Sequence, residues 1–446
     1  MDLKVLYKLF LLLIFVGMLF TDLPFFPEKT VTHSLMFIIS PIIFIIILLI
    51  KNFKLNINTF IIKIFFIYMI TTLFTSFLLL TYVFLKKGDL ITFNKNLCLK
   101  FLEAFFSLTF LHFTVIYNFN FLVQKIDLAF LKKLIYIIFL FLTISAFIEY
   151  FSPTILDFLH ASPKMYHRIR LFTMEPSQAV LLYFIFASLS LFFCKKNILR
   201  FLIFLLFIIS SVFIASKGFF ITLLVTNIFL LIKNLKNVKS LPILSILTIL
   251  SYYIFSNLVL PSIYIDIEKF SSFSTRISGM ISAVLILIFF PFGTGYGTYL
   301  YFYPDILKKS YNIANQIFLH MFSIPLSSVE IDSMISTGQN LGAKSGILQA
   351  IMFNGWFGLL VFLAIFLKLK SQIKNLSIYK NDKLILEFIL YVIIIQLLIG
   401  SEYTLLYCVW LPLVLIQELN RLKEVKNEAQ TSIYSSSKSL SSSRWR

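Results

Sequence analysis

The sequence has little charge, few cysteines and few histidines, and each shortage argues against a class of protein. Charged residues are 13% of the chain against 59% hydrophobic residues, a balance that no soluble domain needs. Cys98, Cys194 and Cys408 are isolated and odd in number, so they indicate neither a disulfide framework nor a metal cluster. The histidines lack the spacing of metal ligands. We therefore expect an integral membrane protein with no metal and no cofactor.

The positive net charge of +19 does not form a binding face for an acidic partner. The lysines and arginines lie in short connections between apolar runs, which is typical of the orientation signals of membrane proteins. We therefore do not expect nucleic-acid binding. No small-residue cleavage site follows the first apolar run, at residues 5–21, so we expect a retained helix and not a signal peptide.

Long apolar runs recur along the chain and predict transmembrane helices. Basic residues gather in alternate connections, which by the positive-inside rule places both termini in the cytoplasm. The expected fold class is therefore all-α, a polytopic membrane protein with about twelve transmembrane helices in one domain over residues 1–420. The twelve spans lie at residues 5–21, 32–50, 62–85, 97–117, 130–151, 176–194, 198–215, 218–232, 241–260, 347–367, 384–400 and 403–417.

Two polar segments are expected on the outer side of the membrane, at residues 152–175 and 261–345. The second contains an apolar run, 278–290, that is short for a span and would reverse the charge pattern if it crossed. We expect a large, partly helical outer loop with an interfacial helix there. The serine-rich end, 421–446, is expected to be a disordered cytoplasmic tail. We find no internal repeat that indicates the symmetry of a transporter.

The most informative polar stretch directly precedes the span at 176–194. Arg168 and Arg170 come before Glu175, and Pro176 suits the first position of a helix. The free N–H groups and positive dipole of that helix start, beside two guanidinium groups, form a ready site for phosphate or pyrophosphate. Glu175 is a candidate proton acceptor in this position. The alternative is an interfacial anchor with an internal Arg–Glu pair.

Two further cations lie on the outer side without a topological reason. Lys217 lies in the tight turn between two spans, and Arg276 lies at the start of the short apolar run. Both are candidates for holding the anionic part of a lipid-linked substrate. Snorkelling to the surface is the alternative for Lys217, and anchoring to lipid headgroups is the alternative for Arg276.

A glycine-rich segment at residues 291–297 lacks the spacing of the dinucleotide-binding fingerprint. It predicts a sharp turn that brings the backbone close to a ligand or to another helix. Tyr299 and the aromatic residues after it are candidates for stacking on sugars. The alternative is a plain interfacial aromatic belt.

Carboxylates recur near the outer ends of the spans. Glu103 and Glu149 lie near the outer ends of the fourth and fifth spans, and Glu402 begins the last one. Their shared depth is compatible with a polar pocket, although each carboxylate can instead pair with a nearby cation. His320, in the large outer loop, is the second candidate for proton transfer after Glu175.

Four segments together resemble a known family. Residues 170–179, RLFTMEPSQA, resemble the Arg-x-x-Gly-x-x-x-Glu-Pro-Ser segment of bacterial O-antigen polymerases, and residues 216–218, SKG, resemble the Ser-Arg-Gly turn of the wider O-antigen ligase and polymerase superfamily. Arg276 followed by the glycine-rich turn resembles that superfamily's Arg…P-x-G-x-G-x-G element. Residues 345–358 are similar to its helix that re-enters the membrane after the large loop. The ligase branch has a histidine where this chain has Lys344, which favours the polymerases.

The resemblance implies a GT-C-like, metal-independent membrane glycosyltransferase on the periplasmic face of a bacterial inner membrane. It would transfer a glycan from undecaprenyl pyrophosphate to a sugar hydroxyl of another lipid-linked repeat unit, among membrane lipids and with a chain-length regulator as partner. The alternatives are an O-antigen ligase acting on lipid A core, and a polysaccharide flippase or other transporter. The residues expected in the site are Arg168, Arg170, Lys217 and Arg276 at the pyrophosphate, Glu175 or His320 as the base, and Glu103, Glu149, Tyr299 and Lys344 in the sugar pocket.

Overall fold

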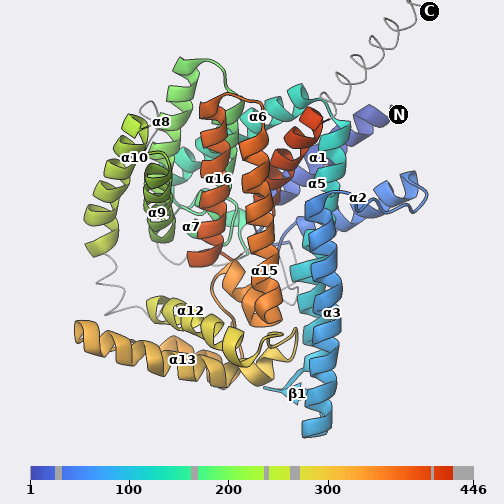
Figure 1. The fold of residues 1–446 in the computed structure, drawn as a ribbon, viewed down its shortest axis with the longest axis vertical. Helices are drawn as coiled ribbons and strands as arrows, with labels where there is room; N and C mark the ends of the chain where they lie inside the picture. Colours follow the sequence, from blue (N-terminus) through green and yellow to red (C-terminus); the bar gives the residue numbers. More distant parts are fainter. Residues whose placement is uncertain are drawn as a thin grey trace, which may run out of the picture.

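The computed structural model describes residues 2–25, 33–161, 169–235, 241–261, 272–402 and 406–424. These residues are mostly helical, with one two-stranded hairpin (Figure 1). By length and composition, 6 helices are suited to cross a membrane, and shorter apolar helices accompany them. The all-α membrane fold predicted from the sequence is therefore confirmed.

Each segment drawn as a span overlaps a helix of the structure. One rod continues from α4 to α5 through a π-helical segment, Phe105–Phe110, and α10 continues into another, Phe255–Val259. Six helices meet the criteria for crossing, so the number of twelve crossings stays a prediction. The helices are α1 (Leu3–Leu19), α2 (Met36–Ile50), α3 (Phe60–Lys87), α4 (Leu97–Ala104), α5 (Leu111–Lys125), α6 (Leu128–Phe151), α7 (Pro176–Phe193), α8 (Asn197–Ile214), α9 (Lys217–Lys233), α10 (Leu241–Ile254), α15 (Gly346–Asn375), α16 (Lys380–Ile399) and a helix at residues 410–424.

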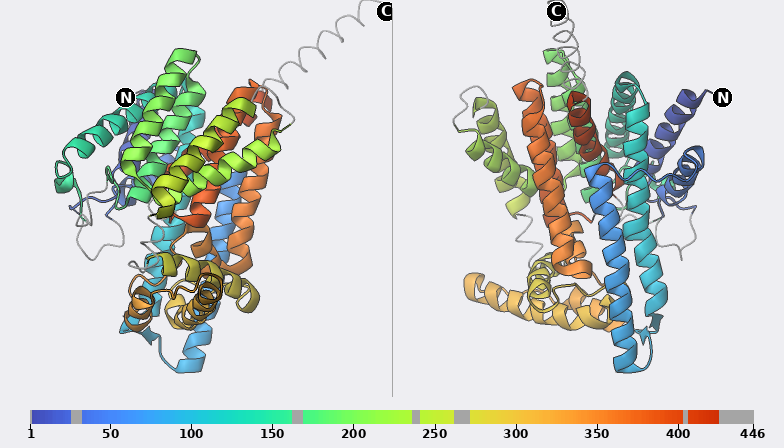
Figure 2. Two further views of the ribbon diagram at one scale, coloured as in Figure 1. Left: turned by 90° about the vertical axis from the view of Figure 1, so that its left-hand side faces the viewer. Right: turned by 45° about the vertical axis from the view of Figure 1, so that its right-hand side comes forward.

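A second layer of helices lies across one end of this bundle. The helices α12 (Ser272–Phe289) and α13 (Tyr299–Phe322) run across the direction of α3 and α16 in Figure 1, and Figure 2 shows the same arrangement from two further sides. The helix α12 contains the predicted 278–290 run but begins earlier, so Arg276 lies within it. The sequence analysis did not identify α13 as a helix.

The helix α13 is amphipathic, which explains why it packs in this layer. Its buried residues recur every three or four positions, as Leu300, Tyr303, Leu307, Ser310 and Ala314. Its exposed side carries polar residues in the first half of the helix and apolar residues as well in the second half. In the sequence, this spacing is obscured because the buried set includes polar and aromatic residues as well as aliphatic ones.

The glycine-rich turn joins this layer to α15. Gly355 has a φ of +55° and divides α15 into two segments. The turn packs into that break, where the N–H of Thr294 donates to the Met352 carbonyl at 2.8 Å and the N–H of Gly295 donates to the Phe353 carbonyl at 3.0 Å. The sharp turn predicted from the sequence, close to another helix, is confirmed.

Side chains are sterically excluded from this contact. Gly293 has a φ of +79°, and a Cβ atom on it would lie 2.3 Å from the Phe353 carbonyl oxygen. A Cβ atom on Gly355 would lie 2.1 Å from the Pro291 carbonyl oxygen. Only glycine combines this backbone conformation with this close approach.

A small hairpin holds the connection between α13 and α15. Its strands β1 (Ile91–Thr92) and β2 (Lys95–Asn96) link α3 to α4. Lys95 Nζ donates to the carbonyl of Gly338 at 2.8 Å, at the end of the short helix α14 (Val329–Thr337). Two single-turn 3₁₀ helices complete the described structure, at Asp157–Leu159 and Tyr407–Val409.

We predict that Gly293→Ala destabilises the protein by on the order of 3 kcal/mol, because the added Cβ is strained at positive φ and overlaps the backbone of α15. Thermal unfolding in detergent, followed by size-exclusion fluorescence, measures the effect. Gly279→Ala is the matched control, since its Cβ would lie 3.8 Å from Ala343 Cα in ordinary contact. Equal melting temperatures for the two variants would contradict the role given to the turn.

Candidate functional site

Four helix ends meet at the connection that follows α16. The Ser401 carbonyl accepts the N–H of Gly346 at 2.9 Å, where α15 starts, and Ser401 Oγ donates to the carbonyl of Ser177 at 3.4 Å, where α7 starts. A Cβ atom on Gly400 would lie 3.8 Å from the Cα of Gly218, where α9 starts. The starts of α7, α9 and α15 therefore surround the end of α16.

A buried amide fixes this junction. Gln396 Oε1 accepts a hydrogen bond from Thr222 of α9 at 2.7 Å, and Gln396 Nε2 donates to Ser401 Oγ at 2.8 Å. Gln396 is fully buried in the apolar second half of α16. Gln396 was not among the residues expected in the site, although a polar residue inside an apolar run is costly and is visible in the sequence.

Cations surround the same junction. The Arg276 guanidinium extends from α12 over the two glycines, and Nη1 would lie 3.7 Å from a Cβ atom on either Gly218 or Gly400. Lys217 is the first residue of α9, and Lys344 directly precedes the Ser345 that caps α15. The structure thus brings together three of the candidate cations from separate elements. With three helix starts, they give the junction a positive character that suits a phosphate or diphosphate.

A short helix of the loop orients two of these elements. Glu330, in α14, accepts a hydrogen bond from Thr275 Oγ1 at 2.8 Å, and its other carboxylate oxygen lies 4.0 Å from Lys344 Nζ. Thr275 is the residue before Arg276. Among the described residues, no carboxylate forms an ion pair with Arg276, whereas Lys344 pairs with Glu330.

Two carboxylates lie at the edge of the cationic junction. Glu402 follows Ser401 and is partly buried, and Glu175 is the exposed N-cap residue of α7. Burial raises the pKa of the Glu402 carboxyl, and Lys344 and Arg276 act against this effect. Glu402 was considered in the sequence only as one of several carboxylates of similar depth.

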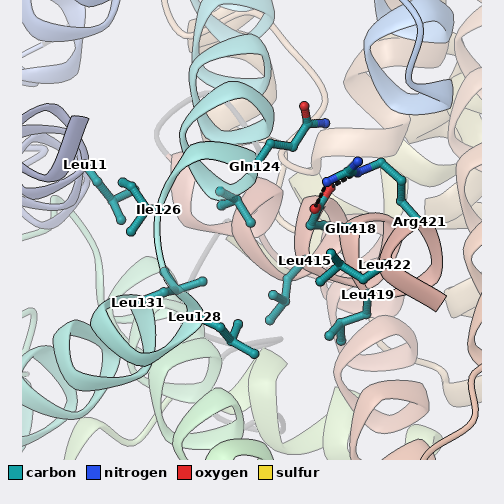
Figure 3. Close-up of a pocket in the computed structure, with 11 residues that line it drawn as sticks. Leu11, Gln124, Ile126, Leu128, Leu131, Leu415, Glu418, Leu419, Arg421 and Leu422 are labelled. Atoms are coloured by element: carbon teal, nitrogen blue, oxygen red, sulfur yellow. Dashed lines mark hydrogen bonds and ion pairs between the residues drawn. The ribbon is translucent and has the colours of Figure 1, made fainter. Parts of the chain in front are cut away.

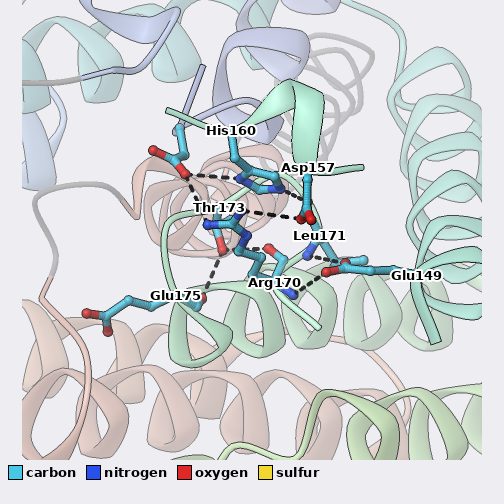
Figure 4. A network of polar contacts seen from close by, with 8 residues as sticks. Glu149, Asp157, His160, Arg170, Leu171, Thr173 and Glu175 are labelled. Atoms are coloured by element: carbon cyan, nitrogen blue, oxygen red, sulfur yellow. Dashed lines mark hydrogen bonds and ion pairs between the residues drawn. The ribbon is translucent and has the colours of Figure 1, made fainter. Parts of the chain in front are cut away.

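Arg170 belongs to a different, buried network (Figure 4). Its guanidinium is 4% exposed and lies 3.9 Å from Asp22 and 3.6 Å from Asp157. His160 Nδ1 lies 3.0 Å from the same Asp22 carboxylate. These contacts join the connection that follows α1 to the segment that precedes α7.

Glu149 anchors the backbone of that segment. Its carboxylate accepts the N–H of Arg170 at 3.1 Å and the N–H of Leu171 at 2.8 Å. Leu171 has a φ of +52°, so the carboxylate supports a strained turn. Figure 4 shows the Glu175 side chain pointing away from Arg170, so the internal Arg–Glu pair considered in the sequence is replaced by pairs with Asp22 and Asp157.

The remaining candidates lie elsewhere or outside the described residues. Glu103 pairs with Lys100 within α4. Tyr299 opens α13 next to the glycine-rich turn, and His320 is exposed in the last turn of the same helix. Arg168 lies outside the described residues. Their roles in the site stay predictions.

A cavity of about 200 Å³ lies at the other end of the bundle (Figure 3). It is bounded by α1, the start of α6 and the helix at 410–424, with the Glu418–Arg421 ion pair among its lining residues. None of the residues that line the cavity belongs to the junction, so the two are separate. Within the described ranges, no cluster of three or more His, Cys, Asp or Glu side chains is placed to hold a metal ion.

The fold defines an all-α membrane protein with a cationic junction at one end of its helix bundle. No protein-family model matches the chain. It is similar to an uncharacterized 49.5 kDa protein in the cps region of Klebsiella pneumoniae, with 25% identity over 256 residues. The similarity covers 55% of this chain and 57% of the other protein, so each is matched over little more than half of its length.

We predict that Arg170→Ala destabilises the folded protein, because it leaves the buried Asp22 carboxylate without its guanidinium. Breaking a buried ion pair typically costs on the order of 3 kcal/mol. The measurement is the melting temperature in detergent together with the amount of protein in the membrane. Lys309→Ala, at an exposed lysine on α13, is the control and should melt like the wild type. If Arg170→Ala leaves both quantities unchanged, the network is not structural.

Proposed function

We propose that the protein is a membrane glycosyltransferase that polymerises a surface polysaccharide from lipid-linked repeat units. The donor is an undecaprenyl-pyrophosphate-linked glycan, and the acceptor is a sugar hydroxyl of another lipid-linked repeat. The observation that carries this proposal is the Arg276 guanidinium lying over the ends of α9 and α16, next to two lysines and three helix starts. Similarity to a protein from a capsule (cps) region supports a role in polysaccharide synthesis.

The chemistry of the junction suits a diphosphate leaving group. Arg276 offers a planar, bidentate donor for phosphate oxygens, whereas Lys217 and Lys344 act as point charges. The three helix starts add the positive ends of their dipoles, which favour the negative charge that develops on the diphosphate as the bond breaks. Such preorganised donors lower the barrier by stabilising the departing diphosphate.

The orientation that we propose places the junction on the outer side of the membrane, in a chain of twelve spans with both ends in the cytoplasm. Three helices that begin or end near the junction carry lysine at their opposite ends: Lys195 follows α7, Lys233 ends α9 and Lys374 lies in the last turn of α15. Lysine at these helix ends favours their placement on the cytoplasmic side of the membrane. A junction facing the periplasm of a bacterial inner membrane meets lipid-linked glycans there.

The first test is the loss of polymer in Arg276→Ala. Removing a charge-stabilising donor should reduce the polymerisation rate by about 10²–10³-fold, and Arg276→Lys should recover little of it. Chain lengths on gels and the rate with purified lipid-linked repeats measure the effect. Lys309→Ala, an exposed lysine on α13, is the control. Normal chain length in Arg276→Ala excludes the diphosphate assignment, and bare lipid A core in a gene deletion indicates a ligase.

The second test concerns orientation. In a variant with its three cysteines replaced by serine, Lys309→Cys on α13 should react with an impermeant thiol reagent added from outside. Lys374→Cys, exposed at the end of α15, should react only after the membrane is permeabilised. Labelling of both positions from the same side contradicts the proposed topology.

A further inference from the structure

We infer that Glu402 accepts the proton of the attacking sugar hydroxyl. This assignment rests on the proposed function, and it replaces Glu175 and His320 as the base. The geometry that points to it is the position of Glu402 directly after Ser401, which forms hydrogen bonds with the starts of α7 and α15. A general base must be held within hydrogen-bond reach of the acceptor hydroxyl, close to the donor phosphates.

The backbone next to Glu402 is fixed from several sides. The Ser401 N–H donates to the Gln396 carbonyl at 3.0 Å, and the Ser401 carbonyl accepts from Gly346 at 2.9 Å. The hydroxyl of Ser401 contacts both Gln396 and Ser177. Glu402 therefore leaves a segment that is bound to α7, α15 and α16 at once. Such support maintains a catalytic geometry better than an isolated loop does.

Charged groups from several elements face this carboxylate. Burial raises the pKa of the Glu402 carboxyl, Glu175 adds to the rise, and Lys344 and Arg276 oppose it. Glu402 is thereby a stronger base than an ordinary glutamate, and the two cations favour its ionised form. The groups involved are Arg276 from α12, Lys344 before α15, Glu175 at the start of α7, and Glu330 of α14 through its contact with Lys344.

Glu175 and His320 do not combine burial with a position beside Arg276. Glu175 is exposed, and its carboxylate accepts a hydrogen bond from Ser177 Oγ at 3.2 Å. His320 is exposed at the end of α13 remote from the glycine-rich turn. Glu402 alone among the three is partly buried and adjacent to the Arg276–Gly400 contact.

The transfer step balances without an oxidant or a metal. The acceptor hydroxyl oxygen forms a bond to the anomeric carbon of the donor glycan, and the bond from that carbon to the phosphate oxygen breaks. Its electron pair leaves with the diphosphate, next to Arg276. The hydroxyl proton passes to the Glu402 carboxylate, which later releases it to water.

The test compares Glu402→Gln with Glu175→Gln in purified protein supplied with lipid-linked repeats. Glu402→Gln should lower the transfer rate by about 10²–10⁴-fold while binding of the lipid diphosphate stays within about twofold. Glu175→Gln should retain most of the rate. A Glu402→Gln protein that transfers at the wild-type rate overturns the assignment.

The pH profile separates a base from a structural residue. A base must be ionised, so the wild-type rate should fall as the pH decreases through the raised pKa of Glu402, above the value of 4.5 of a free glutamate. Glu402→Asp should show the same decrease. The low residual rate of Glu402→Gln should not change with pH in this range. An unchanged profile in Glu402→Gln overturns the assignment, and Glu402→Asp supplies the comparison if the glutamine variant does not fold.

Failure of this inference is distinguishable from failure of the proposed function. If Arg276→Ala loses lipid diphosphate binding and transfer while Glu402→Gln keeps the full rate, only the base is assigned wrongly. If Arg276→Ala also transfers normally, the proposed diphosphate site itself is wrong.

Discussion

The contact of Arg276 with Gly218 and Gly400 is the constraint on which the cationic junction at one end of the helix bundle depends. The guanidinium lies against the ends of α9 and α16, with Nη1 3.7 Å from the position that a Cβ atom on Gly218 or Gly400 would occupy. The same contact joins the crossing layer of α12 and α13 to the helix bundle. The packing of the crossing layer on the bundle therefore also sets the position of the charge. If the two layers moved apart, the Arg276 guanidinium would leave the three helix starts.

Arg170 and Arg276 have opposite environments. Arg170 is enclosed by carboxylates, and burying such a charge is tolerable only when it is paired. Arg276 is partly exposed and lies against glycine rather than carboxylate. The first arrangement stabilises the segment before α7, and the second leaves a cation available to an anionic ligand. This difference is why we assign structure to one and substrate binding to the other.

The positions of the bundle helices were predictable because the length of an apolar run depends on local composition alone, whereas the more polar α13 was not predicted. The glycine-rich turn was also predictable, since positive φ and close approach require glycine. The environments of Arg170 and Arg276 were not predictable, because both arginines are followed by apolar residues in the sequence. The difference between them is the ion pair of Arg170 with Asp22, which comes from a distant part of the chain. Glu402 was similarly hidden, since its neighbours Lys344 and Arg276 come from other elements.

The most direct measurement is chain growth by the purified protein in a defined lipid bilayer with lipid-linked repeats as both donor and acceptor. The account predicts longer glycans on the lipid, with one undecaprenyl pyrophosphate released for each repeat added, and no loss of rate when divalent cations are chelated. Repeats that cross the bilayer without growing, or that remain unchanged while the protein binds them, would contradict it.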